Sequence, residues 1–233
     1  MNKIFILNKK RTILHLTKKI SETKKQLIML TGGKDIQLIL KEKKFVNSIS
    51  KKKIILSDER LIDKIKFQNQ NIYRKKKISI YLNFLSFLKN NKYQILENIK
   101  QLKKKIDLPE IAILGIGSDG HILSIFNNND FKKKSMIIKT KKNNENFYRA
   151  SFSINYVEKI KKIYFIINFE NKVKFLNNMF NNRSIFYKFL KLKKNNLNII
   201  FLTQKNPKKI KNIIQTKMDK KILNFFNNRF FFI

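Results

Sequence analysis

The stretch that decides the fold runs from Pro109 to Phe126 and reads PEIAILGIGSDGHILSIF. Its first part is a short apolar run, Ile111 to Leu114, which is typical of a buried strand. Residues 115–120 follow as a glycine-punctuated segment, and glycine permits the tight backbone turns that such a segment needs. From His121 the apolar residues return at helical spacing, so the pattern predicts a strand, a glycine-rich turn and a helix. Such a turn lets a ligand approach backbone N–H groups at the start of the helix.

Residues that are rare elsewhere in the chain are concentrated in this stretch. The chain has five glycines; three of them lie here, and the other two form the adjacent pair Gly32-Gly33. One of only two histidines, His121, also belongs to the stretch. This distribution makes residues 115–121 a candidate functional loop.

The composition indicates one globular domain. A length of 233 residues with 42% hydrophobic content is sufficient for one buried core. The chain has no cysteine, which excludes disulfides and thiolate metal ligands, and with one candidate-site histidine we expect neither a metal nor a cofactor. The first residues carry charges too early for a signal peptide, and no uncharged apolar run approaches the ~18 residues of a membrane span. We therefore expect a cytoplasmic protein with no membrane partner, either a monomer or a homodimer.

The formal net charge is +38, from 53 basic and 15 acidic residues. Such an excess is typical of proteins that bind nucleic acid or an anionic membrane surface. Here it consists mostly of lysine in short scattered runs, together with abundant Asn, Ile and Phe, a bias typical of A/T-rich codon usage. Because the lysines form no single stripe, we interpret most of them as solvated surface and expect no specific nucleic-acid partner. The charge should still attract anionic substrates.

Short apolar runs alternate with helical patterns along the chain. Strands are expected at 27–30, 54–56, 111–114, 136–138, 149–154, 163–167 and 198–202, and helices at 12–25, 36–40, 78–105, 172–180 and 185–192. Residues 69–77 are polar and are expected to form a loop. The alternation predicts a Rossmann-like α/β fold, with a mainly parallel sheet flanked by helices, in a single domain over 1–233. The basic aromatic tail, 207–233, is expected to pack on the core, while a docking helix or a dimer contact stays open.

Three of the apolar runs end in polar or glycine-rich clusters. These clusters read TGGK at 31–34, SDER at 57–60 and GIGSDGH at 115–121. In parallel sheets, binding sites lie beyond the carboxyl ends of the strands. The three clusters are therefore expected to meet at one edge of the sheet, and together they are a stronger signal than any one alone.

At these clusters the chain resembles the 6-phosphogluconolactonase family, within the wider group that includes glucosamine-6-phosphate deaminases. The family pattern L-G-x-G-x-D-G-H-x-x-S-L-F stands here at residues 114–126 with a single leucine-to-isoleucine change. The order and spacing of the motifs hold over about Leu27 to Leu176. The further motifs that carry the resemblance are the glycine pair Gly32-Gly33, the D-E-R at Asp58-Glu59-Arg60, a strand start at Arg149-Ala150-Ser151 similar to R-I-T, and a later lysine similar to Lys172.

The chain departs from the family pattern at a few positions. Lys34-Asp35-Ile36 stands where the family has S-T-P after its glycine pair, and Asn127 stands where a proline follows L-F. The deaminase branch has M-D-E-Y where this chain has D-E-R, so Arg60 replaces its tyrosine. This difference favours the lactonase branch over the deaminase branch.

The residue types fit the hydrolysis of a phosphorylated lactone, the activity that the resemblance implies. His121 can act as general base, because a neutral imidazole is available near pH 7. Asp119 can hold the other ring nitrogen, bind a sugar hydroxyl or cap a helix. The backbone N–H groups of Gly117 to Gly120 are candidates for stabilising the oxyanion.

The phosphate of such a substrate should be held by cations and backbone amides. The resemblance implies that Arg149 and Lys172 hold it, with Gly32 and Gly33 letting the chain close on the anion. Three further candidates are Lys34, which can compensate for the lost Ser and Thr, Arg60 at the end of its cluster, and Asp58. Asp58, like Glu59, can orient Arg60 or sugar hydroxyls, or can form a structural ion pair.

The expected reaction is hydrolysis of 6-phospho-D-glucono-1,5-lactone, the second step of the oxidative pentose phosphate pathway, as the resemblance implies. A phosphosugar lactone is thus the expected partner. Three alternatives stay open: a glucosamine-6-phosphate deaminase or isomerase, a basic nucleic-acid-binding protein, and a degraded enzyme that keeps only the fold.

Overall fold

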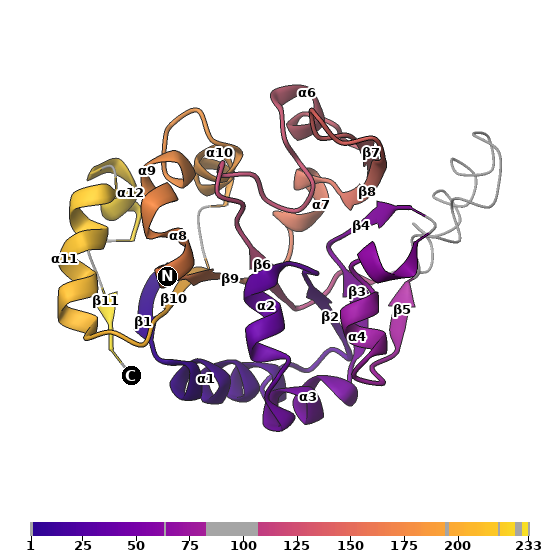
Figure 1. Ribbon diagram of the computed structural model, residues 1–233, viewed down its shortest axis with the longest axis horizontal. Helices are drawn as coiled ribbons and strands as arrows, with labels where there is room; N and C mark the ends of the chain where they lie inside the picture. The colour runs from indigo at the N-terminus through magenta and orange to yellow at the C-terminus, as the bar shows by residue number, and fades with distance from the viewer. Residues whose placement is uncertain are drawn as a thin grey trace.

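The computed structural model describes residues 2–62, 64–82, 107–193, 196–218, 220–226 and 230–232 (Figure 1). Its centre is an eight-stranded sheet with the order β11-β1-β10-β9-β6-β2-β3-β5, in which all neighbouring strands are parallel. This confirms the predicted α/β fold with a mainly parallel sheet. The strands are β1 (Lys3–Leu7), β2 (Leu27–Leu30), β3 (Lys53–Leu56), β5 (Ile80–Leu82), β6 (Ile111–Gly115), β9 (Lys162–Asn168), β10 (Leu197–Leu202) and β11 (Phe230–Phe231).

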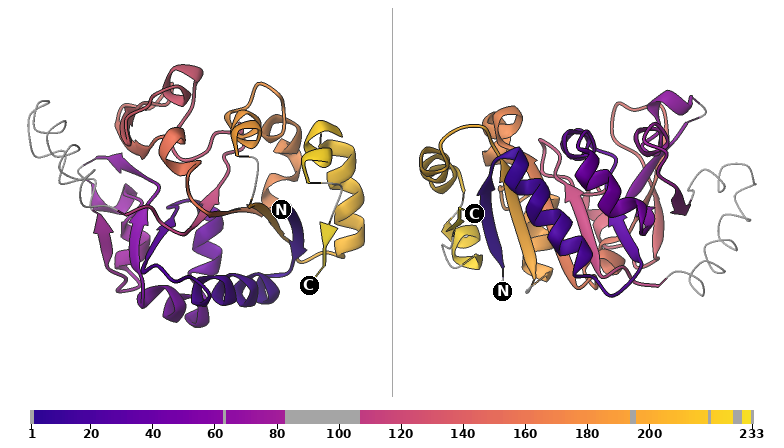
Figure 2. Two further views of the ribbon diagram at one scale, coloured as in Figure 1. Left: turned by 180° about the vertical axis from the view of Figure 1, so that it is seen from behind. Right: turned by 90° about the horizontal axis from the view of Figure 1, so that it is seen from below.

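Helices cover both faces of this sheet, as adjacent residues of β9 show. Successive strand residues point to opposite faces. Tyr164 contacts the ring of His15 on α1 (Lys9–Ser21), with 5.8 Å between the ring centroids. Phe165 instead contacts Phe186 on α10 (Ile185–Leu192) at 4.9 Å. The helix α1 therefore lies across one face of the sheet and α10 on the other (Figure 2). This burial on both sides explains why the strands read as continuous apolar runs.

The order of the strands creates a switch point between β2 and β6. From β2 the chain moves outward to β3 and β5, whereas from β6 it moves the opposite way to β9 and β10. The loops after β2 and β6 consequently diverge, and the amide of Thr31 donates to Ile113 O at 3.1 Å where they part. In open parallel sheets ligands bind beyond the carboxyl ends of the strands at such a point. Both glycine clusters lie there.

A second, antiparallel sheet has the order β4-β8-β7 and lies beside the switch point. It consists of β4 (Asp58–Leu61), β8 (Tyr148–Phe152) and β7 (Ile137–Thr140). The predicted strands 136–138 and 149–154 thus exist but belong to this smaller sheet. Asp58-Glu59-Arg60, expected as a polar cluster after a strand, is itself a strand, because its backbone pairs with β8.

The remaining helices are short, and several boundaries differ from the prediction. The expected helix 172–180 is broken into three pieces, the expected loop 69–77 contains α4, and β1 and α3 were not predicted. The expected helix 78–105 begins instead with β5, and residues 83–106 lie outside the described part. These elements are α2 (Lys34–Ile39), α3 (Lys43–Ser50), the 3-10 helix η1 (Ile65–Phe67), α4 (Asn71–Arg74), α6 (Asn128–Phe131), α7 (Ile154–Val157), α8 (Phe169–Lys172), the 3-10 helix η3 (Val173–Phe175) and α9 (Leu176–Met179).

The helix predicted directly after the central glycine loop is wrong. Residues 116–127 form an irregular loop with isolated bridges between Ile116, Ile122 and Ile125, and the next helix is α6. Leu123 has a positive φ of 57°, which a right-handed helix does not allow. A helix N-terminus is therefore absent from this loop, and any ligand there must be held by side chains and loop amides.

The tail packs into the core, as expected. The helix α11 (Pro207–Lys217) contacts β1 and α9, and its Ile210 and Ile214 are fully buried. Beyond α12 (Lys220–Phe225), the strand β11 pairs with β1 and lengthens the sheet at that edge. The tail thus covers the edge of the sheet at β1 (Figure 1).

Candidate functional site

The loop after β6 folds around His121. The amide of Gly117 donates to His121 O at 2.8 Å, and the amide of Gly120 donates to Gly117 O at 2.9 Å. A Cβ on Gly117 would lie 2.2 Å from the His121 ring, so only glycine leaves room for that ring. Gly120 has a φ of +81°, the left-handed region that favours glycine. Because the Gly117 N–H is already used inside the loop, it is not available to an oxyanion in this arrangement.

His121 and Asp119 form a hydrogen-bonded pair between Nδ1 of the imidazole and Oδ1 of the carboxylate. Partial burial raises the pKa of Asp119, but the hydrogen bond and the nearby His121 outweigh it and hold that pKa well below its usual range. Lys142 adds a positive charge 3.6 Å from Asp119 Oδ2. Since an ionised Asp119 accepts the proton on Nδ1, the neutral imidazole keeps its lone pair on Nε2. That is the tautomer that a general base requires.

Phe126 connects this pair to Arg149. The Phe126 ring centroid lies 4.6 Å from the His121 centroid and 5.5 Å from the Arg149 guanidinium carbon. These two distances place the guanidinium within about 10 Å of the imidazole centroid, a separation that one small sugar can span. The predicted convergence of the central loop with Arg149 is therefore present.

Arg149 is held by an acid and lies opposite a second arginine. Its guanidinium donates to both carboxylate oxygens of Glu145, at 2.6 and 2.9 Å, and only 9% of the residue is exposed. In the antiparallel pairing of β4 with β8, Arg149 is the direct partner of Arg60. Arg60 donates to Phe67 O at 2.8 Å. Two arginines at one register position repel each other, so the pair favours an anion nearby.

Lys172 joins three segments of the site. Its ammonium donates to Asp35 of α2 and to the carbonyl of Ile116 in the central loop, both at 2.5 Å. The side chain is 18% exposed and that of Asp35 is 5% exposed. The departure from the family pattern at residue 35 thus supplies the carboxylate that positions Lys172. An ammonium has three N–H donors, so one remains for a ligand.

The D-E-R segment, residues 58–60, supports the site through buried hydrogen bonds. Asp58 is buried and accepts hydrogen bonds at 2.7 Å from Ser57 and from Ser124 of the central loop. Asn69 donates to Asp58 O at 3.0 Å, and a Cβ on Gly32 would lie 2.3 Å from the Asn69 side chain. Gly32 is therefore required for the β2 loop to approach this network. Asp58 has its hydrogen bonds with neutral groups inside the protein and none with Arg60 among the described residues.

Glu59 holds the turn that follows β4. Its carboxylate accepts from the amides of Arg60, Asn69 and Gln70 at 2.5 to 2.8 Å. Burial raises the pKa of Glu59 to about 7 despite these three hydrogen bonds. The residue is 1% exposed, so its role is to position the turn.

Two of the expected binding residues stay at the surface. Gly33 is the N-cap of α2, and Lys34 is the first residue of that helix. Both are exposed. Within the described part of the chain, no hydrogen bond or ion pair joins the Lys34 side chain to the central loop.

The sequence analysis missed two cations beside His121. A cavity of about 260 Å³ is lined by the Asp119–His121 pair, by Phe126 and by Arg183 and Lys188. The segment before α10 is fixed there, because the amide of Phe186 donates to Gly120 O at 2.8 Å. Lys188 donates to Asn128 Oδ1 at 2.5 Å. The scarcity of arginine, with six in the chain, was the available signal for Arg183.

The described residues contain no group of three or more His, Cys, Asp or Glu side chains that could hold a metal ion. Among the same residues, no helix combines the length and the apolar character that crossing a membrane would require.

Comparison with known proteins assigns the family. Among solved structures, the chain is similar to the 6-phosphogluconolactonases from Plasmodium vivax (22% identity, TM-score 0.64, covering 90% of this chain and 92% of that one) and Thermotoga maritima (18%, 0.65, 87% and 99%). That from Leishmania guyanensis is also similar (15%, 0.68, 86% and 96%). A comparison with curated protein sequences finds no match. Residues 8–187 match the family described as glucosamine-6-phosphate isomerases/6-phosphogluconolactonase, and the chain therefore belongs to this family.

Proposed function

We propose that this protein hydrolyses 6-phospho-D-glucono-1,5-lactone to 6-phosphogluconate, the second step of the oxidative pentose phosphate pathway. The observation that carries the proposal is the Asp119–His121 pair, whose imidazole lines a cavity together with two cations. The three solved structures compared above are 6-phosphogluconolactonases, which supports the same reading. The substrate is a water-soluble phosphosugar, and ester hydrolysis by a general base needs no cofactor.

His121 is the general base in this proposal. Its Nε2 takes a proton from a water molecule as that water attacks C1 of the lactone. The C1–O5 bond then breaks, and the imidazolium returns the proton to the leaving ring oxygen. Asp119 positions the ring through Nδ1 and stabilises the imidazolium that forms in between. A positioned base of this kind contributes about 10² to 10⁴ to the rate.

The phosphate is assigned to the cations on the side of Arg149. That guanidinium has five N–H donors and spends two on Glu145, so three are free to bind phosphate oxygens. Arg60, the cross-strand partner of Arg149, lies beside it and adds positive charge. Lys172 is assigned a ligand contact through its remaining donor.

Arg183 and Lys188 are assigned to the reacting end of the substrate, because they line the same cavity as His121. A cation there stabilises the negative charge that develops on the lactone carbonyl oxygen. This role replaces the one expected for the Gly117 amide, which is bonded within the loop.

The test is a paired assay with two substrates. Freshly prepared 6-phosphogluconolactone should open faster with the protein than spontaneously, in proportion to enzyme concentration. Glucosamine 6-phosphate should release no ammonia under the same conditions. Ammonia release without lactone hydrolysis would assign the chain to the isomerase branch, and absence of both activities would mean that only the fold is retained.

A further inference from the structure

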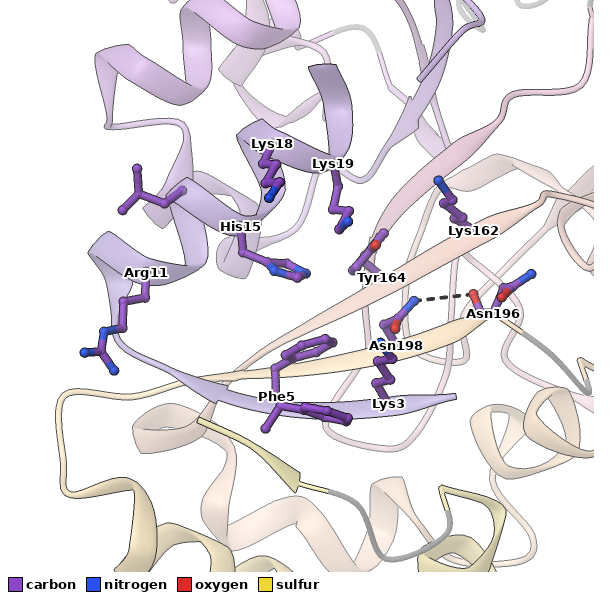
Figure 3. Close-up of a pocket in the computed structure, with 12 residues that line it drawn as sticks. Lys3, Phe5, Arg11, His15, Lys18, Lys19, Lys162, Tyr164, Asn196 and Asn198 are labelled. Atoms are coloured by element: carbon purple, nitrogen blue, oxygen red, sulfur yellow. Dashed lines mark hydrogen bonds between the residues drawn. The ribbon is translucent and has the colours of Figure 1, made fainter. Parts of the chain in front are cut away.

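A second, larger cavity lies at the opposite end of the sheet, where the strands begin. Its volume is about 710 Å³. It is lined by Lys3 and Lys162, the first residues of β1 and β9, by Asn198 near the start of β10, and by one side of α1 (Figure 3). The site described above is at the carboxyl ends of the strands of the same sheet. The two cavities are therefore separated by the length of the sheet.

The charge in this second cavity is unbalanced. Five of its twelve lining residues are basic, compared with 53 of 233 in the chain, and no acidic residue is among the lining residues that the structure describes. Within the described residues, Lys19 alone of these five forms an ion pair, with Glu22 at 2.8 Å. Lys18 and Arg11 are exposed on α1, and Figure 3 shows Lys18 and Lys19 reaching toward the cavity from above. Such a cluster of cations without acids favours an anionic ligand.

Aromatic rings form the wall that faces these cations. Phe5 and His15 lie 4.6 Å apart between ring centroids, and His15 and Tyr164 lie 5.8 Å apart. Phe231 continues the wall from the edge strand, 5.4 Å from Phe5. Figure 3 shows the His15 ring extending from α1 over Phe5 toward Tyr164. Phe5 and Tyr164 are each only 4% exposed, so the ring surface open to the cavity is mainly that of the half-buried His15 and Phe231. Accessible ring faces stack on planar heterocycles, at about 1–3 kcal/mol for each base.

His15 adds an unused polar atom. Its Nε2 is buried and has no hydrogen-bond partner among the described residues. Burial, reinforced by Lys19, lowers the pKa of His15 to about 4, so the ring is neutral near pH 7. Buried polar atoms are nearly always satisfied by the protein or by water, and an exception requires an explanation. Since that atom is shielded from solvent, a bound base would contact His15 through the face of its ring and not through Nε2.

We propose that this cavity binds a nucleoside polyphosphate such as ATP, with its base against the half-buried rings of His15 and Phe231 and its phosphates among Lys3, Lys18 and Lys162. The two halves of this ligand match the two linings of the cavity, since the base is planar and polar and the phosphates are anionic. The volume falls within the range of about 300–1,000 Å³ that is usual for small-molecule sites. The inference does not depend on the proposed lactonase activity, because it uses neither His121 nor the cations around it.

Isothermal titration calorimetry with ATP, inorganic triphosphate and adenosine tests the proposal on the intact chain. ATP should bind at one site per chain, and at least about tenfold more tightly than triphosphate or adenosine, because each of these lacks one of the two recognised halves. Equal affinity for ATP and triphosphate would overturn the base-stacking role of the wall. Absence of ATP binding at millimolar concentration would overturn the site itself.

Charge variants locate the binding. The double variant Lys18→Gln/Lys162→Gln should weaken ATP at least about tenfold, because charged contacts to phosphate are lost. The matched control is the double variant Lys10→Gln/Lys132→Gln, which removes two exposed charges that do not line the cavity. Equal weakening by the control would mean diffuse attraction by a protein of +38 charge and would contradict the proposal. Tighter binding of polyuridylate than of ATP would contradict it in favour of single-stranded nucleic acid.

Discussion

The two ends of the central sheet differ in how far their cations are paired with acidic side chains. At the carboxyl end, acids hold three of the cations: Glu145 holds Arg149, Asp35 holds Lys172, and Asp119 faces Lys142. At the amino end, five cations line one cavity without an acid in its described lining. The overall charge of +38 is common to both ends and therefore explains neither.

The two ends differ in whether their cations have fixed positions before a ligand binds. A cation that is bonded to a buried or half-buried acid has a fixed position before a ligand arrives, and fixed charges are what catalysis requires. Unpaired lysines at a cavity mouth attract an anion and adapt to it, which suits binding. In a lysine-rich protein, the pairing of the cations is thus more informative than their number. The predictions below test this contrast, beginning with the largest effect.

The strongest test of the carboxyl end is His121→Ala. We expect kcat for 6-phosphogluconolactone to fall by about 10²- to 10⁴-fold, because the general base is lost. The fold should persist, since His121 lies in a loop and is partly exposed. The measurement is lactone hydrolysis corrected for spontaneous opening, together with thermal melting. Lys132→Ala, an exposed position beyond the loop, is the control and should keep full activity. Unchanged turnover in His121→Ala would remove this residue from the mechanism.

The next largest effect concerns Arg149, which is ion-paired with Glu145. In Arg149→Ala, KM for the phosphorylated lactone should rise by about tenfold or more, because charge-assisted bonds to phosphate are lost. The KM for unphosphorylated gluconolactone should stay within about twofold, since that substrate has no phosphate to lose. Steady-state kinetics on both substrates measures the difference. Lys141→Ala, an exposed residue of the neighbouring loop, serves as the control. Equal losses on both lactones would show that Arg149 does not bind phosphate.

A structural prediction concerns the buried network that joins β4 to the central loop. Ser124→Ala removes the hydroxyl that donates to Asp58 at 2.7 Å inside the protein. The free energy of unfolding should fall by about 1–3 kcal/mol, because the Asp58 carboxylate loses a buried donor. Urea denaturation gives the value. Ser50→Ala, whose hydroxyl bonds only locally at the surface, should change it by less than about 0.5 kcal/mol. A similar small change for Ser124→Ala would mean that the network does not stabilise the loop.

The smallest expected effect is a pH dependence that arises at the amino end. His15 has a pKa of about 4 in the folded protein and about 6.5 when unfolded, so the unfolded chain binds more protons between these values. Stability from this group is therefore complete above pH 6.5 and is lost as the pH falls toward 4. Because the ring is partly exposed, the contribution is roughly 1 kcal/mol. Urea denaturation at pH 7 and pH 5 measures this contribution. Between these pH values the free energy of unfolding should fall by about 1 kcal/mol more in the parent than in His15→Leu. Equal losses would show that the ring can be protonated in the folded state.

The parts that sequence predicted best are those with a strong local pattern. The apolar runs of β2, β3, β6, β9 and β10 were found because strands buried on both faces must be continuously hydrophobic. The clustering of loops at one edge followed from parallel topology. The central motif made His121 and Asp119 candidate site residues, and the structure shows that these two side chains are hydrogen-bonded to each other.

The missed features depend on contacts between distant segments. The loop after His121 is not helical, because Leu123 adopts a positive φ and Ser124 turns inward to Asp58, 66 positions away in the chain. Arg183 comes to the site through the hydrogen bond between Phe186 and Gly120, which no local pattern encodes. The ion pair of Lys172 with Asp35 likewise joins residues 137 positions apart. Sequence gave no reason to expect the amino-end cavity, whose lining comes from α1 and the edge strands.

The most direct test of the account is a crystal structure with the product 6-phosphogluconate. The account predicts the C1 carboxylate within about 3 Å of His121 Nε2, the reach of a general base, and the phosphate on Arg149. Product bound with its phosphate at His121, or bound away from this loop altogether, would contradict it.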